Sequence, residues 1–201
     1  MTCEFSIKTF DDLTSVDLYH ILKARSQVFV VEQNCAYQDM DDVDFDCLHL
    51  VAHQNAVLVG YCRIIPPEFN KVKPKTAESK ALGPMPSIGR VLIMPEHRGD
   101  GLAREIMLQA IKYCRKKYGK KPIIISAQTY LLRFYESLGF VPDGEVYLED
   151  NIEHITMIQQ VAKKKKVAAQ LTEAPTVNKI LYTLLILLTT LFIAGLLYLA
   201  I

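Results

Sequence analysis

The sequence predicts an α/β fold in which a mixed sheet of six to seven strands carries helices on both faces, followed by a C-terminal transmembrane helix. Short apolar runs alternate with amphipathic segments, and two of the helices must connect strands as crossovers, which predicts the sheet. An uncharged C-terminal run predicts the membrane helix. We therefore expect a globular domain over residues 1–162, a lysine-rich tether over 163–179 and a tail anchor over 180–201.

A strand and a helix are predicted at the N-terminus. Residues 4–10 place apolar side chains at alternate positions, the period of a half-buried strand. Thr14 or Ser15 then caps a helix, since a hydroxyl accepts a hydrogen bond from a first-turn amide. A seven-residue step separates Arg25 from Glu32, so we expect both on one side of this helix, with Arg25 pairing with a carboxylate or lining a cleft.

An acidic segment and a hairpin follow. The carboxylates of residues 41–46 can in principle hold a cation, but a run of like charges is more typical of a solvated loop, and we expect a solvated loop. Residues 47–53 and 57–65 are rich in β-forming side chains. The polar residues 54–56 between them predict an antiparallel hairpin.

The segment over residues 87–103 joins a buried strand to a helix through a glycine turn. Val91 to Met94 form an apolar run bounded by glycine and proline, which is typical of a buried strand. Behind Gly101, apolar residues recur at steps of three and four, and Gly119 follows a basic last turn. We therefore expect one amphipathic helix between these two glycines.

This turn has the features of an anion-binding site. The first amides of a helix lack intrahelical acceptors, and glycines let the backbone approach a diphosphate closely. Arg98 adds a permanent positive charge. The segment lacks the Gly-Lys-Ser/Thr ending of a P-loop and the triple-glycine spacing of a dinucleotide fingerprint. An ordinary glycine turn is the alternative.

The remaining elements complete the sheet. Residues 66–86 hold five prolines and form a long irregular loop, which in a compact domain is either functional or mobile. Residues 122–128 predict a buried strand, residues 131–138 a short helix ended by glycine, and residues 152–161 the last strand.

Composition excludes several classes of protein. Five cysteines without C-x-x-C spacing, and no apolar leader, indicate reduced thiols in a cytosol-facing domain. The net charge is +1, and five lysines lie in residues 163–179, outside the domain, so we expect no nucleic-acid partner. His49 and His53 would lie ~13 Å apart on one strand face, too far for shared ligation, so we expect no metal site.

The C-terminal run fits a single membrane span. At ~1.5 Å per residue, residues 180–201 reach about 33 Å, enough to cross a hydrocarbon core of roughly 30 Å. Tyr182 and Tyr198 lie near its ends, where interfacial aromatics are favoured. Lysines precede the run, so the positive-inside tendency places the N-terminal domain at the cytosolic face of a membrane. A buried core helix, the alternative, would show a polar stripe.

Two motifs carry a family resemblance. The pattern Arg98-x-x-Gly101-x-Ala103 resembles the acyl-coenzyme A (CoA) diphosphate loop of the GNAT superfamily of N-acetyltransferases. Residues 134–140 resemble its second motif, a helix whose tyrosine, here Tyr135, approaches the CoA sulphur. Further stretches are similar to the ElaA-like subgroup, namely residues 28–33, 37–39, 88–91, 127–128, 145–150 and 154–155. The resemblance covers residues 4–158, without the tether and tail.

The resemblance implies an N-acetyltransferase with acetyl-CoA as co-substrate and an unidentified amine as acceptor, joined by direct attack in a ternary complex. It implies two splayed strands that hold the CoA. The residues implied in CoA binding are Leu92, Ile93, Met94, Arg98, Gly99, Asp100, Gly101, Leu102, Ala103 and Gln128. Gln128 stands where many members of the superfamily carry asparagine, a departure that the ElaA-like subgroup shares.

The same resemblance assigns the catalytic roles. Tyr135 is expected to be the general acid, because a phenol with a pKa of ~10 stays protonated at neutral pH and can donate to the leaving sulphur. Glu32, Glu149 and His154 are the candidates for the base. For any one of these three we favour a structural role, whereas for Tyr135 we favour catalysis over the alternative of a core aromatic.

Two other functions stay open at this point. A CoA-binding or protein-interaction module at a membrane surface can keep the fold without the chemistry. Acyl transfer to a lipid-derived or signalling acceptor, as in acyl-homoserine lactone synthases of similar fold, is the second. Retention of Arg98, Gly101, Ala103 and Tyr135 together favours the enzyme, with the lipid bilayer as a further partner through residues 180–201.

Overall fold

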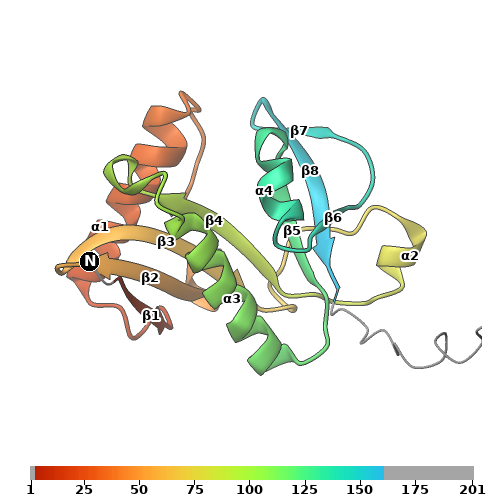
Figure 1. The fold of residues 1–201 in the computed structure, drawn as a ribbon, viewed down its shortest axis with the longest axis horizontal. Helices are drawn as coiled ribbons and strands as arrows, with labels where there is room; N and C mark the ends of the chain where they lie inside the picture. The colour runs from red at the N-terminus through yellow and green to blue at the C-terminus, as the bar shows by residue number, and fades with distance from the viewer. Residues whose placement is uncertain (1–2, 161–201) are drawn as a thin grey trace, which may run out of the picture. The chain divides into compact units, whose positions relative to one another are not determined.

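The computed structural model describes residues 3–160, which belong to one compact unit, Met1–Val161 (Figure 1). An eight-stranded sheet has the order β1-β2-β3-β4-β5-β8-β6, with β7 paired to β8. The strands are β1 (Glu4–Lys8), β2 (Leu48–Gln54), β3 (Val57–Ile65), β4 (Ser87–Ile93), β5 (Ile123–Gln128), β6 (Val141–Pro142), β7 (Tyr147–Glu149) and β8 (Ile152–Gln159). The α-helices are α1 (Ser15–Arg25), α2 (Ala77–Lys80), α3 (Leu102–Tyr118) and α4 (Leu132–Glu136). A π-helix, η1 (Ser26–Glu32), and three 3₁₀ turns, η2 (Val43–Asp46), η3 (Pro95–His97) and η4 (Thr129–Leu131), complete the list.

The sheet is mixed, as predicted. Strands β4 and β5 run parallel, and every other neighbouring pair is antiparallel. The predicted count of six to seven strands is one or two below the eight observed, and the two shortest strands account for the difference. Strands β6 and β7 have two and three residues, too few for a period of two to be visible in the sequence.

Helices cover both faces of the sheet, which confirms that prediction. Helix α3 lies across β2, β3 and β4 (Figure 1) and buries Ile106, Met107, Ala110 and Cys114 in the larger core. Helix α4 contributes Tyr135 to the same core. On the opposite face, α1 and η1 pack against the sheet through a second cluster of apolar side chains. This cluster consists of Ile21, Ala24, Val28, Val51, Leu58, Tyr61 and Leu92.

The first helix begins as predicted and continues in an unexpected form. Thr14 caps it in a capping box. The Thr14 hydroxyl accepts a hydrogen bond from the Asp17 amide, and the Asp17 carboxylate accepts one from the Thr14 amide. At Ser26 the α-helix passes into the π-helix η1, which has more residues per turn. The seven-residue step therefore does not return to the same side. Arg25 is fully buried while Glu32 is exposed, so the expected shared side is wrong.

Asp143 fixes the proline-rich segment over residues 66–86. Its buried carboxylate accepts hydrogen bonds from the Lys75 amide at 2.7 Å, the Thr76 hydroxyl at 2.7 Å and the Ser79 hydroxyl at 2.9 Å. Thr76 also caps the short helix α2. Burial opposes ionisation of Asp143, but these donors outweigh it and lower the pKa of its carboxyl. The segment is thus anchored to the sheet near β6.

No helix between residues 3 and 160 has both the length and the apolarity to cross a membrane. The predicted tether and tail anchor, residues 163–179 and 180–201, lie outside the described residues. Both stay predictions.

Candidate active site

Strands β4 and β5 begin side by side and then separate. Their ladder pairs Ser87 with Ile124, and the Ile124 amide donates to the Pro86 carbonyl at 3.0 Å. Beyond this point β4 continues along β3, while β5 continues along β8, so the two carboxyl ends diverge (Figure 1). A cavity of about 280 Å³ lies between them, lined from one side by residues 87–91 and from the other by Ser126 and Gln128.

A β-bulge shapes the β4 side of this cavity. Arg63 pairs with Gly89 and Tyr61 pairs with Leu92, which leaves Arg90 and Val91 opposite one residue of β3. Arg90 has a φ of 51°, in the left-handed region, which costs a non-glycine residue about 1 kcal/mol. The bulge directs the Arg90 side chain toward the cavity, where it lines the wall.

The end of β4 presents one amide toward the gap. The Met94 amide donates to the Val59 carbonyl of β3 at 2.9 Å. Because successive amides of a strand point to opposite edges, the Ile93 amide faces away from β3. Of the predicted CoA-binding residues Leu92, Ile93 and Met94, the structure therefore leaves the Ile93 amide available, while the side chains of Leu92 and Ile93 are buried.

The start of α3 presents three more free amides. Gly101 caps the helix with a φ of 82°, and the amides of Arg104 and Glu105 donate to its carbonyl. Within residues 3–160, the amides of Gly101, Leu102 and Ala103 have no acceptor. The space where a Cβ would stand on Gly99 or Gly101 is open. Partial positive charge at the helix terminus makes this a fitting site for a diphosphate.

Arg98, the predicted diphosphate ligand, is already bound within the protein. Its Nη1 and Nη2 donate to the two carboxylate oxygens of Glu32 at 2.6 and 2.8 Å, and its Nε donates to the Ile93 carbonyl at 3.0 Å. These hydrogen bonds lower the pKa of the Glu32 carboxyl. The structure thus joins two predicted site residues, Arg98 and Glu32, in one ion pair that does not line the cavity.

Tyr135 lines the cavity from α4. Its ring is 7% exposed and packs edge-on against Phe134 and Phe140, with centroids 5.1 and 6.0 Å away. Burial raises the pKa of the Tyr135 hydroxyl above its ordinary value of 10, so the phenol keeps its proton at neutral pH. No other group in the described residues hydrogen-bonds to this hydroxyl, which leaves it available to a ligand.

Two of the base candidates lie on the same wall of the cavity. Glu149 accepts a hydrogen bond from the Ser126 hydroxyl at 2.9 Å. The Nδ1 of His154 lies 2.9 Å from the Ile152 carbonyl. A carbonyl can only accept, so Nδ1 carries the proton in this contact and Nε2 of the neutral ring keeps a lone pair. Glu149 and His154 therefore line the cavity together with Tyr135, whereas Glu32 does not.

Gln128 and Gln33 bridge the opening of the cavity. The Nε2 of Gln128, at the end of β5, donates to Oε1 of Gln33 at 3.2 Å. Gln33 follows η1 directly, and both glutamines line the cavity. The Oε1 atom of the Gln128 side chain remains available to a ligand.

A buried network of arginines and aspartates, which we call the floor, reaches the cavity through Asp41, Arg63 and Arg90. The expected pairing of Arg25 with a carboxylate is confirmed, but the sequence did not indicate the rest of the network. Arg25 donates to the carboxylates of Asp39 at 2.8 Å and Asp44 at 2.6 Å. Arg63 holds both oxygens of Asp41, at 2.6 and 2.9 Å. The predicted solvated loop over residues 41–46 is therefore wrong for Asp44, which is 7% exposed, and for Asp41, which is paired.

Arg90 completes this network from the bulge. Its Nε donates to the Asp39 carboxylate at 2.6 Å, and the Tyr37 hydroxyl donates to the same oxygen at 3.0 Å. The guanidinium lies over the rings of Phe29 and Tyr37. Burial opposes ionisation of Asp39, but the charges of Arg25 and Arg90 lower the pKa of its carboxyl. Three arginines balance three aspartates, so the floor is ordered without net charge.

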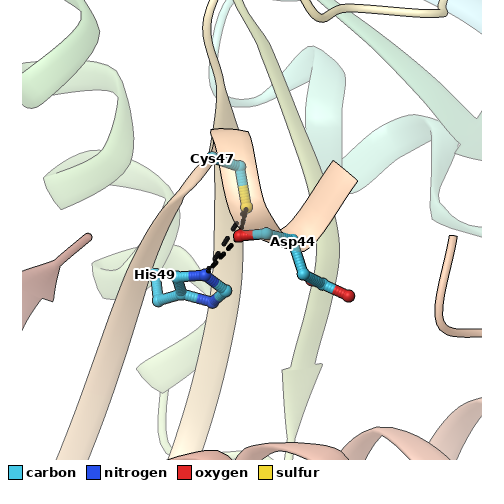
Figure 2. A group of neighbouring side chains, drawn as sticks. All are labelled: Asp44, Cys47 and His49. Carbon is cyan, nitrogen blue, oxygen red and sulfur yellow. Dashed lines mark hydrogen bonds between the residues drawn. The ribbon is translucent and has the colours of Figure 1, made fainter. Parts of the chain in front are cut away.

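Asp44, Cys47 and His49 gather beneath this floor but do not form a metal site. In Figure 2 the hydrogen bonds of Cys47 and His49 run to the backbone carbonyl of Asp44, although a carboxylate oxygen of Asp44 also lies within 4.8 Å of the Cys47 sulphur and the His49 ring. That carboxylate is held by Arg25 and Arg63. Both His49 nitrogens are engaged, and burial raises the pKa of the Cys47 thiol to about 12. Two adjacent cations and a protonated thiol disfavour a bound metal ion.

Known proteins share this fold and this sequence. The acetyltransferase (GNAT) domain family matches residues 12–161. A UPF0039 protein of Schizosaccharomyces pombe is 37% identical over 77% of this chain and 95% of its own length. ElaA of Escherichia coli is 37% identical over 75% of this chain and 92% of its own length.

Solved structures agree. An acyl-CoA N-acyltransferase from Pseudomonas aeruginosa has a TM-score of 0.69 at 35% identity, covering 79% of this chain and 99% of its own. The crystal structure of Escherichia coli ElaA has a TM-score of 0.68 at 34% identity, covering 79% of this chain and all of its own. The similarity thus spans the whole cavity and its walls.

Proposed function

This chain belongs to the acetyltransferase (GNAT) domain family and is an acyltransferase, and on that premise we propose that it moves an acetyl group from acetyl-CoA to an amine acceptor. The observation that carries the proposal is the gap between β4 and β5, whose cavity is lined by a protonated tyrosine, together with the free amides at the start of α3, the helix that follows β4. One ligand with a diphosphate, an extended arm and a thioester fits all three features.

The backbone provides the binding groups. The amides of Gly101, Leu102 and Ala103 would hold the diphosphate, since they are unpaired and lie at the positive end of a helix. The extended arm of CoA would run along the gap past Gln128. The Gln128 amide can hydrogen-bond to this arm as a neighbouring strand would. CoA supplies the activated acetyl group.

The side chains of the cavity would move the protons. The Ile93 amide stabilises negative charge that develops on the carbonyl oxygen as the amine attacks. Tyr135, which keeps its proton at neutral pH, donates that proton to the sulphur as the carbon–sulphur bond breaks, and it takes a proton back from solvent before the next turnover. His154 or Glu149 accepts the proton of the amine, since both line the cavity. Attack then needs no covalent enzyme intermediate.

Release of CoA by the full chain in detergent tests this proposal. Polyamines, amino acids and peptide amino termini are offered with acetyl-CoA, and CoA is measured by chromatography because the partly exposed Cys3 and Cys35 would react with a thiol reagent. Acetylation of at least one amine is expected, with saturation in acetyl-CoA. Tight binding of CoA with no turnover on any amine would instead favour a binding module.

We further propose that residues 180–201 anchor this domain at the cytosolic face of a membrane. The support is the uncharged run preceded by lysines. The full chain should stay in the membrane fraction after alkaline carbonate washing, and a chain ending at residue 162 should not. Release of the full chain by carbonate would contradict the anchor.

A further inference from the structure

The segment over residues 32–35 has contacts at the ends of both separated strands, and its Gln33 and Cys35 line the cavity. Glu32 pairs with Arg98, which follows β4, and Gln33 accepts from Gln128, at the end of β5. Cys35 reaches the Asp150 carbonyl, between β7 and β8, at 3.4 Å. Three contacts within four residues thus tie one short segment to both sides of the gap.

The contact on the β4 side also holds the strand itself. Arg98 binds Glu32 with both Nη groups and the Ile93 carbonyl with Nε. Three of the five N–H groups of its guanidinium are therefore used within the protein. The amide of the same residue, Ile93, faces the gap. Arg98 is thus placed to hold the reacting edge of β4 against η1.

We propose that Arg98 and Glu32 are positioning residues, which together with Gln33 form a strap that sets the geometry of the acceptor side of the cavity. The diphosphate is then held by the α3 amides, and Arg98 is not its ligand. This inference rests on the proposed function of the same site. It reassigns Arg98 and Glu32 from the roles that the family resemblance implies.

The π-helix explains why such a strap is needed. A π-helix of seven residues is uncommon. The end of η1 is formed by Val31 and Glu32, both exposed, and the amides of Gln33 and Asn34 both donate to the Val31 carbonyl. The side chains of Glu32 and Gln33 add contacts to the distant residues Arg98 and Gln128, which tie this irregular end to the rest of the domain.

Charge exchange separates the two roles of Arg98. In the full chain, Glu32→Gln and Arg98→Glu each remove the ion pair, and the double variant Glu32→Arg with Arg98→Glu restores it in reverse. We expect each single variant to lower kcat/KM for the fastest amine of the panel three- to tenfold and to speed amide exchange over residues 26–35. The double variant should recover most of the lost kcat/KM and most of the slow amide exchange. In all three variants the Kd of CoA should stay within about threefold of that of the unchanged chain.

Two controls sharpen the test. Glu96→Gln removes an exposed carboxylate that acts on Arg98 only through its charge, and it should change neither quantity. Gln33→Glu keeps an acceptor for Gln128, whereas Gln33→Met does not, so only Gln33→Met should lower kcat/KM. If Arg98→Glu weakens CoA binding strongly and the exchange of charges does not restore it, Arg98 is a diphosphate ligand and the strap is refuted.

Amide exchange keeps this test separate from the proposed function. If no amine is acetylated but exchange over residues 26–35 still rises in the single variants and falls in the double variant, the strap stands and the acceptor class is wrong. Unchanged exchange in both single variants would refute the strap whatever the activity.

Discussion

At the residue scale, the cavity places a protonated phenol without a partner beside two groups that can accept a proton. Tyr135 is held by its ring between Phe134 and Phe140, so its hydroxyl is positioned without a hydrogen bond. His154 and Glu149 line the same cavity. In this arrangement Tyr135 donates a proton to the sulphur, and a different residue, His154 or Glu149, accepts a proton from the amine.

Replacing Tyr135 by phenylalanine tests that division. Because the hydroxyl has no partner in the described residues, Tyr135→Phe should change the free energy of unfolding by less than about 0.5 kcal/mol. The loss of a general acid should lower kcat at least about tenfold with little change in the KM of acetyl-CoA. Tyr113→Phe, on α3, is the matched control. Equal turnover by Tyr135→Phe would remove the tyrosine from the mechanism.

The arginine–aspartate network predicts a loss of stability in acid. Burial opposes ionisation of Asp41, but the hydrogen bonds and charge of Arg63 lower its pKa to about 2, against an ordinary 3.8. A lowered pKa stabilises the fold above pH 3.8, and that stability is lost as pH falls toward 2. This carboxyl should contribute about 2 kcal/mol to the decrease between pH 5 and pH 2.

Asp41→Asn tests the contribution directly. The variant is expected to be less stable at pH 7 but to lose less stability on acidification, as measured by urea unfolding at several pH values. Asp42→Asn, one residue on and exposed, should follow the unchanged chain. A parallel decrease in all three proteins would show that Asp41 is not the group that titrates.

Local patterns could predict some of these residues and not others. The amide-rich turn at Gly101 and the helix carrying Tyr135 follow from short motifs, and Tyr135 lines the cavity. The pairing of Asp39 with Arg90 spans 51 residues, and that of Glu32 with Arg98 spans 66. Such long-range contacts leave no local signature, so an acidic run looks solvated and a free arginine looks like a ligand.

At the scale of elements, the parting of β4 from β5 creates the site. Each strand keeps a full partner on its outer side, so the parting costs few hydrogen bonds. The hairpin of β2 and β3 follows from its sequence, because Asn55 and Ala56 adopt the left-handed conformation of a tight turn. Helix η1 could not be predicted from the sequence, since nothing in a short sequence separates a π-helix from an α-helix.

The proline-rich segment offers a prediction at this scale. Asp143→Ala removes a buried acceptor shared by three donors and should lower the free energy of unfolding by about 1–3 kcal/mol. Amide exchange should rise over residues 66–86, part of which lines the cavity. Exchange confined to residues near Asp143 itself would contradict an anchoring role.

At the scale of the whole molecule, an acyltransferase domain precedes a run that is expected to cross a membrane. The α/β class, the mixed sheet and its two covered faces could be predicted, because apolar periodicity records burial. The cavity could be expected only through the resemblance of two motifs to a known family. Its floor and its bridging segment depend on tertiary contacts that no single stretch contains.

Calorimetric titration of CoA into the full chain tests the central claim most directly, namely that the α3 amides hold a diphosphate beside the gap. Gly101→Gln and Gly83→Gln are compared, since both glycines have positive φ and open space around a Cβ, and both variants should lose about 1–2 kcal/mol of stability. Only Gly101→Gln places a side chain over the free amides. The account predicts that it raises the Kd of CoA at least about tenfold, while Gly83→Gln leaves the Kd unchanged. Equal Kd values for all three proteins, or no binding to the unchanged chain, would contradict it.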